Sequence, residues 1–127
     1  MSLRIKELRK DTKQAQDFFE KHLAYTLGPV ELKNFMDKGG IRIVDVRRKE
    51  DYELGHIINA LSIPKDELED NFHKHSKDEI TIIYCYNREC HLGASACLVL
   101  AEYGYPVMHL DGGYKTWVED FKFEVIK

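Results

Sequence analysis

One continuous stretch, residues 79–96, constrains the fold more than any other part of the sequence. It reads EITIIYCYNRECHLGASA, which is an apolar run rich in β-branched residues, then a short polar loop, then small and apolar residues. The first part predicts a strand that ends at Cys85, and apolar residues recur at helical spacing from Leu92 to Tyr103. The stretch therefore predicts a strand, a loop and a helix, with Cys85 at the end of the strand.

The position of Cys85 in this stretch suggests chemistry. A loop that leads from a parallel strand into a helix N-terminus directs several backbone N–H groups at one point and favours an anion there. Arg88 and His91 lie in the same loop, and cysteines near helix N-termini, Arg or His have lowered pKa values. We therefore expect Cys85 to be a thiolate nucleophile. From position alone, a buried structural cysteine remains the alternative.

Composition limits the remaining classes of function. A chain of 127 residues fits one domain, and a net charge of −3 without pooled lysines gives no nucleic-acid footprint. No apolar segment is long enough to span a bilayer, and residues 1–7 lack the apolar core of a signal peptide, so we expect a cytoplasmic protein. Three cysteines do not make a secreted disulfide framework. The spacing of Cys85, Cys90 and His91 does not match a zinc knuckle, so no metal is expected.

Further strands and helices are expected to alternate along the chain. The patterns predict an amphipathic helix in residues 1–22, an edge strand in 23–26, a helix in 29–37, strands in 41–46 and 60–64, a helix in 65–75, a strand in 107–110 and a helix after residue 113. This order predicts an α/β fold, in which a mostly parallel sheet of about five strands has helices on both faces in a single three-layer domain. We expect residues 23–127 to form the domain and residues 1–22 to be a separate N-terminal helix.

Several separated motifs then carry a resemblance to a known family. They are Asp45-Val46-Arg47, Tyr52, Gly55-His56-Ile57, Ala60, Tyr84-Cys85, Gly104-Tyr105, Leu110-Asp111-Gly112-Gly113 and Trp117. In this order, the motifs resemble those of the rhodanese-like domain, a single-domain sulfurtransferase fold. The resemblance implies that Cys85 takes sulfane sulfur from a donor such as thiosulfate, becomes a persulfide and passes the sulfur to a thiophilic acceptor. It implies no metal or organic cofactor.

The resemblance also assigns roles to individual residues. The loop N–H groups would hold the terminal sulfur of the persulfide as an oxyanion hole holds oxygen. This anion loop comprises Tyr86, Asn87, Arg88, Glu89, Cys90, His91 and Leu92. Structural support, rather than direct chemistry, is expected from Asp45, Arg47, His56, Gly112 and Gly113, because the Asp-x-Arg pair fixes neighbouring loops and the two glycines need unusual backbone angles.

The active loop departs from the usual pattern of the family. Counted back from Gly104-Tyr105, the position that an arginine usually holds falls on Leu92, and the loop is longer by about two residues. Cell-cycle dual-specificity phosphatases share the fold and have a loop of similar length, but they need an arginine to clamp phosphate where this chain has His91. Phosphatase activity is therefore the less favoured alternative.

The second cysteine of the loop leaves a different alternative open. Cys90 could resolve a persulfide or sulfenate on Cys85 by forming a disulfide, or it could simply pack beneath the helix. The main hypothesis is a sulfurtransferase or persulfide carrier, and its rival is a regulatory or redox-sensing module without turnover. Expected partners are a small anionic sulfur donor, a thiol or cyanide-like acceptor and a protein sulfur acceptor. The chain is expected to be a monomer or a homodimer, with Phe18-Phe19 as a candidate contact.

Overall fold

The computed structural model describes residues 3–71, 73 and 76–127, and a five-stranded parallel sheet forms its centre. The strand order is β1-β6-β5-β2-β4. The strands span β1 Thr26–Leu27, β2 Ile41–Asp45, β4 Leu61–Ser62, β5 Ile80–Tyr84 and β6 Val107–Leu110. In the central strand β5, every residue from Thr81 to Tyr84 is buried, as expected for a strand that is covered on both faces.

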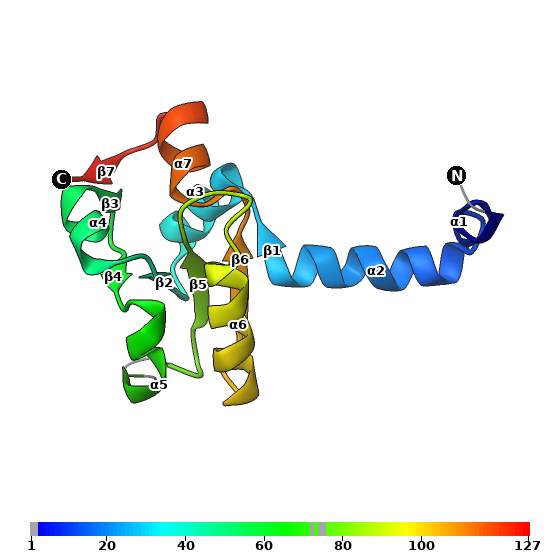
Figure 1. Ribbon diagram of the computed structural model, residues 1–127, viewed down its shortest axis with the longest axis horizontal. Coiled ribbons are helices and arrows are strands. Elements are labelled where there is room, and N and C mark those ends of the chain that lie inside the picture. Colours follow the sequence, from blue (N-terminus) through cyan, green and yellow to red (C-terminus); the bar gives the residue numbers. More distant parts are fainter. Residues whose placement is uncertain (1–2, 72, 74–75) are drawn as a thin grey trace.

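Helices cover both faces of the sheet (Figure 1), so the predicted fold class is confirmed. They are α3 Pro29–Lys38, α4 Lys49–Leu54, the 3-10 helix η1 Lys65–Glu67, α5 Leu68–Asn71, α6 Leu92–Glu102, α7 Gly113–Lys115 and the π-helical turn η3 Thr116–Asp120. One apolar cluster packs Leu32 and Trp117 against the sheet, and a second packs Leu68, Ala96 and Leu100 against it. The sheet therefore separates two apolar layers, one containing α3 and η3 and the other containing α5 and α6.

Two helices, α1 Leu3–Leu8 and α2 Thr12–Tyr25, occupy the N-terminal region. Asp11 begins α2, because its side chain accepts a hydrogen bond from the N–H of Gln14 at 3.1 Å. Helix α2 extends away from the sheet (Figure 1). Within the part of the chain that the structure describes, no helix is both long and apolar enough to cross a bilayer.

The edge strand predicted in residues 23–26 is present, but it starts at Thr26, three residues later than predicted. The helical periodicity of α2 continues to Tyr25, and the N–H of Thr26 still donates to the carbonyl of His22. Extended structure begins at Thr26, where β1 pairs with β6 in the register Thr26 to His109 and Leu27 to Leu110. The apolar residues before Thr26 therefore belong to a helix face and not to the edge strand.

A second, two-stranded antiparallel sheet was not predicted. It pairs β3 His56–Ile57 with β7 Val125–Ile126. The predicted helix in residues 65–75 is shorter and begins with a 3-10 turn, since η1 leads into α5, which ends at Asn71. Residues 72, 74 and 75 of that prediction lie outside the described residues.

Candidate active site

Cys85 lies directly after the central strand β5, at the carboxyl ends of the parallel strands, where ligands bind in open α/β sheets. Two backbone hydrogen bonds fix the loop that follows it. The N–H of Tyr114 donates to the Cys85 carbonyl, and the N–H of Lys115 donates to the Tyr86 carbonyl, both at 2.9 Å. The start of α7 therefore holds the first residues of the Cys85 loop in position.

The glycine pair before α7 makes this close approach possible. Gly112 and Gly113 have φ values of +83° and +61°, the left-handed region that glycine enters without steric cost. A Cβ atom at Gly113 would lie 2.7 Å from the Cys85 carbonyl oxygen and 3.0 Å from the Asn87 nitrogen. Gly113 is therefore required both for its backbone conformation and for the space beside the Cys85 loop.

We predict that Gly113→Ala destabilises the protein more than Gly39→Ala does. Gly39 also has a positive φ, +79°, with ψ of −170°, but a Cβ atom there would have nothing within 4 Å of it, so its substitution costs only backbone strain of about 1–3 kcal/mol. Gly113→Ala adds the collision with the Cys85 carbonyl, for about 1–3 kcal/mol more. Urea unfolding of both variants measures the difference, and equal losses would show that the close packing at Gly113 is unimportant.

The sulfur of Cys85 does not have the predicted environment. The residue is 0% exposed, and burial raises the pKa of its thiol to about 11, with a further increase from hydrogen bonding with Cys90. The N–H groups of Gly93 and Tyr86 oppose these effects and favour the thiolate. The expected lowered pKa is therefore wrong, because the sulfur lies beneath the first turn of α6, although amide donors do reach it.

Cys90 has the opposite character. It is half-buried, and the Cys85 thiol donates a hydrogen bond to its carbonyl oxygen at 3.5 Å. Burial alone would raise the pKa of the Cys90 thiol, but the N–H of Leu92, the Cys85 thiol and the N–H of Tyr86 together lower it. The structure thus brings the two loop cysteines together, with Cys90 as the thiol that ionises more easily.

The charged side chains of the loop are exposed, whereas Leu92 packs against the apolar cluster that contains Cys85. Arg88, Glu89 and His91 are exposed, and Tyr86 is half-buried. The Tyr86 hydroxyl donates a hydrogen bond to the Asp51 carboxylate. Backbone N–H groups, and not the side chains of Arg88 and His91, are therefore the groups that favour the Cys85 thiolate. These donors include Gly93, which lies one residue beyond the predicted anion loop of residues 86–92.

Gly93, the additional donor, was not singled out from the sequence. A Cβ atom there would lie 3.2 Å from the Cys85 sulfur and 2.5 Å from Nε2 of His109 on β6. The distance from His109 Nε2 to the Cys85 sulfur therefore cannot exceed the sum of these two distances. Burial lowers the pKa of His109, against an opposing effect of Asp111, so the ring is neutral at neutral pH. A glycine in the first turn of the predicted helix was the available signal.

A buried polar cluster lies beside the Cys85 strand. The Arg47 guanidinium contacts the Asp45 carboxylate at 2.8 Å and donates to the Gly55 carbonyl at 2.6 Å. The Tyr84 hydroxyl donates to the same carboxylate at 2.6 Å and accepts from the N–H of Ile57 at 3.1 Å. These contacts connect β2 and β5 to the segment around Gly55. The Asp45 carboxylate, the Arg47 guanidinium and the Tyr84 hydroxyl therefore each have partners within the protein.

His56 follows this segment and also contacts protein groups. Its Nδ1 lies 2.9 Å from the Tyr52 carbonyl oxygen, and its ring stacks on the Tyr52 ring with centroids 3.7 Å apart. The Tyr52 hydroxyl in turn donates to the Ala60 carbonyl at 2.7 Å. The imidazole thus joins the end of α4 to the short strand β3.

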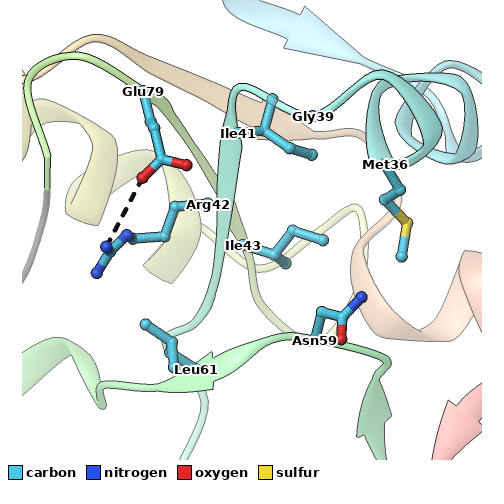
Figure 2. A pocket seen from close by; sticks show the side chains of 8 residues that line it. All are labelled: Met36, Gly39, Ile41, Arg42, Ile43, Asn59, Leu61 and Glu79. Carbon is cyan, nitrogen blue, oxygen red and sulfur yellow. Dashed lines mark ion pairs between the residues drawn. The ribbon is translucent and has the colours of Figure 1, made fainter.

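A cavity at the opposite end of the strands is separate from the cysteine pair (Figure 2). It has a volume of about 300 Å³ and is bounded by the beginnings of β2 and β4. Two of its lining residues, Arg42 and Glu79, form an ion pair on one side of it, with Nη2 and Oε1 3.7 Å apart. Because Cys85 follows the carboxyl end of β5, this cavity does not contribute to the candidate active site.

Comparison with known proteins identifies the family. The model of the rhodanese-like domain matches residues 28–120. The chain belongs to the rhodanese-like family. The match extends from α3 to the π-helical turn η3, and it includes four of the five strands of the sheet and both loop cysteines. Among residues 3–71, 73 and 76–127, no group of three or more His, Cys, Asp or Glu side chains is placed to hold a metal ion.

Curated relatives of this rhodanese-like chain differ in size. Thiosulfate sulfurtransferase GlpE of Coxiella burnetii is 35% identical over 92 residues, which covers 69% of this chain and 81% of GlpE. The HTH-type transcriptional regulator Rv0324 of Mycobacterium tuberculosis is 33% identical over 87 residues, which covers 68% of this chain and 38% of the regulator. The chain thus spans most of GlpE but well under half of the transcriptional regulator.

A solved structure resembles the rhodanese-like chain over most of its length. The BH2092 protein of Bacillus halodurans has a TM-score of 0.84 and 33% sequence identity, with 91% of this chain and 85% of that chain covered. The thiosulfate sulfurtransferase of Pseudomonas aeruginosa has a TM-score of 0.70 and 26% sequence identity. The matched region covers 82% of this chain and 19% of that protein's chain. The same fold therefore occurs as a small protein and as part of a much larger one.

Proposed function

We propose that this chain is a sulfurtransferase or persulfide carrier of the thiosulfate sulfurtransferase type. In this proposal, Cys85 accepts sulfane sulfur from a small anionic donor such as thiosulfate and passes it to a thiol or cyanide-like acceptor. The observation that carries the proposal is the position of the Cys85 sulfur at the end of the central strand, where the N–H groups of Tyr86 and Gly93 reach it and partly offset the increase in its pKa that burial causes. The 35% identity to GlpE supports the same class of reaction.

The reaction balances without a cofactor. The Cys85 thiol first loses its proton to solvent. The resulting thiolate attacks the outer sulfur of thiosulfate, the sulfur–sulfur bond of thiosulfate breaks, and sulfite leaves with the electron pair. The acceptor then attacks the terminal sulfur of the persulfide and regenerates the Cys85 thiolate. Fixed N–H donors stabilise negative charge on sulfur at both stages, and they cost no reorganisation because the loop is already held by α7.

Treatment with thiosulfate provides the test. We predict that the intact protein gains the mass of one sulfur atom and loses it again on addition of cyanide, with formation of thiocyanate. The Cys97→Ser variant is the control and should gain the same mass, because Cys97 lies inside α6 and burial raises the pKa of its thiol to about 12. A protein that gains no sulfur from thiosulfate, or that keeps it in the presence of cyanide, would contradict the proposal.

A second candidate function is a redox-sensing module without turnover. The interaction between the Cys85 and Cys90 thiols, which raises the pKa of Cys85 and lowers that of Cys90, favours this candidate, because it brings a buried thiol and a more acidic one together. With peroxide as oxidant, two thiols would be oxidised to a disulfide while the peroxide is reduced to water. A Cys85–Cys90 disulfide after peroxide, together with no sulfur uptake from thiosulfate, would favour this function over sulfur transfer.

A further inference from the structure

Helix α2 exposes an apolar face to solvent. Ala15, Phe18, Phe19 and Leu23 follow one another at spacings that place them on the same side of the helix. Phe18 is 62% exposed, Phe19 57% and Leu23 71%. Among the described residues of α1 and α2, none is buried. The face that would pack into a core in most surface helices is thus left in water.

A helix of this length is not expected to be stable by itself. Helix α2 has 14 residues, and isolated helices shorter than about 12–15 residues are marginal in water even for favourable sequences. Figure 1 shows α2 extending away from the sheet, so it approaches the sheet only at its C-terminal end, while α1 lies at its other end. A packing partner for its apolar face must therefore come from outside this copy of the chain.

A groove that suits such a helix lies beside the C-terminal end of α2. It has a volume of about 440 Å³, and its lining is mainly apolar. Ala94, Cys97, Leu98 and Ala101 line it from one face of α6, with Leu98 62% exposed. The remaining lining residues are Tyr25, Thr26, Val107 and His109. Small residues on either side of Leu98 allow another helix to approach α6 closely, and the lining carries no Lys, Arg, Asp or Glu that would oppose an apolar partner.

We propose that two copies of this chain pair reciprocally, with the apolar face of α2 of each copy seated in the groove beside α6 of the other. Because Tyr25 at the end of α2 also lines the groove, the donated helix and the accepting groove adjoin one another on each copy. A two-fold axis can therefore satisfy both contacts at once, as in the isologous dimers that are common among soluble proteins.

The exposed area is sufficient for a stable dimer. Phe18, Phe19, Leu23 and Tyr25 are each 57–71% exposed. Because large aromatic side chains each bury about 150–250 Å², these four side chains supply about 400–500 Å² on each copy. Two reciprocal contacts, together with the smaller area of the two grooves, bring the total to roughly 1,000 Å², the lower bound for a specific interface.

Such a dimer would also cover side chains that lie close to the candidate active site. Cys97 and His109 line the groove, and His109 approaches Gly93, beneath which the Cys85 sulfur lies. The partner's α2 would cover both side chains and remove them from water. Access of alkylating reagents to Cys97 therefore reports on the pairing independently of molecular mass.

Molecular mass in solution tests the proposal. Light scattering coupled to gel filtration should give the wild-type chain twice its monomer mass of 14.9 kDa. A Phe18→Glu, Phe19→Glu double variant and a separate Leu98→Glu variant should shift to the monomer mass. Leu54→Glu is the matched control, since Leu54 is 75% exposed on α4, and it should remain a dimer. Circular dichroism checks that each variant retains the secondary structure of the wild type.

Three results would overturn the proposal. The first is a wild-type chain that stays monomeric at its highest soluble concentration, which would mean that another protein or nothing covers α2. The second is a dimer that survives both the α2 and the α6 substitutions. The third is Cys97 alkylation, read by tandem mass spectrometry at equal pH, that is no faster in the Phe18→Glu, Phe19→Glu variant than in the wild type. None of these results depends on sulfur transfer, so the dimer and the proposed function can fail separately.

Discussion

The Cys85→Ser variant is expected to lose sulfur transfer from thiosulfate to cyanide by at least about a thousandfold, because removal of a covalent nucleophile leaves no route through the persulfide. Serine retains the size of the side chain and can still donate to the Cys90 carbonyl, so the loop should keep its shape. Thiocyanate formation, measured at saturating thiosulfate, gives the rate. Thermal unfolding of the variant should differ little from that of the wild type.

Cys97→Ser is the matched control for this experiment. It replaces a cysteine that lies on the next element, α6, and is expected to retain most of the activity. Equal activity in Cys85→Ser and in the wild type would contradict the assignment of Cys85. Equal loss in Cys85→Ser and Cys97→Ser would indicate that any thiol replacement near α6 damages the fold, and that the loss says nothing about the nucleophile.

Asp45→Asn is expected to have the largest effect on stability. Asp45 is 0% exposed, and its carboxylate contacts both the Arg47 guanidinium and the Tyr84 hydroxyl. The amide keeps the size of the side chain but removes the charge, so the buried guanidinium remains without its counterion. Breaking a buried pair in this way costs about 3–5 kcal/mol of the free energy of unfolding. Urea unfolding at neutral pH measures this loss.

An exposed ion pair of the same chain provides the control. Arg48 and Glu50 contact one another at 3.2 Å with side chains that are 76% and 69% exposed. Glu50→Gln should change the free energy of unfolding by only about 0–1 kcal/mol, since solvent screens such a pair. If Asp45→Asn destabilises no more than Glu50→Gln does, the buried cluster beside β5 does not hold the fold together.

The sequence allowed the sheet and the family to be predicted because their signals are local. The β-branched run from Ile80 to Ile83 can only be a buried strand next to a polar loop, and it became β5 at the centre of the sheet. Gly112 and Gly113, which were expected to need unusual backbone angles, have positive φ values. Such features depend on a few neighbouring residues and on backbone sterics.

The burial and the thiol pKa values of the cysteines could not be predicted in the same way. Sequence order places Cys85 before a helix, but the pKa depends on how much of the protein covers the sulfur. Gly93 allows the first turn of α6 to lie over it, which brings both burial and an N–H donor. The pairing of β3 with β7 was equally hidden, since each strand has two residues and they are far apart in the sequence.

The most direct test of the central claim locates the transferred sulfur on the chain. Trypsin cleaves after Lys77, Arg88 and Lys115, so Cys85 lies in the peptide Asp78–Arg88 and the other two cysteines lie in Glu89–Lys115. Protein loaded with thiosulfate and then freed from it should carry the extra sulfur on the first peptide. On addition of cyanide, that peptide should lose as much sulfur as thiocyanate is formed. Thiocyanate formation from protein whose Cys85 peptide carries no sulfur would contradict the claim.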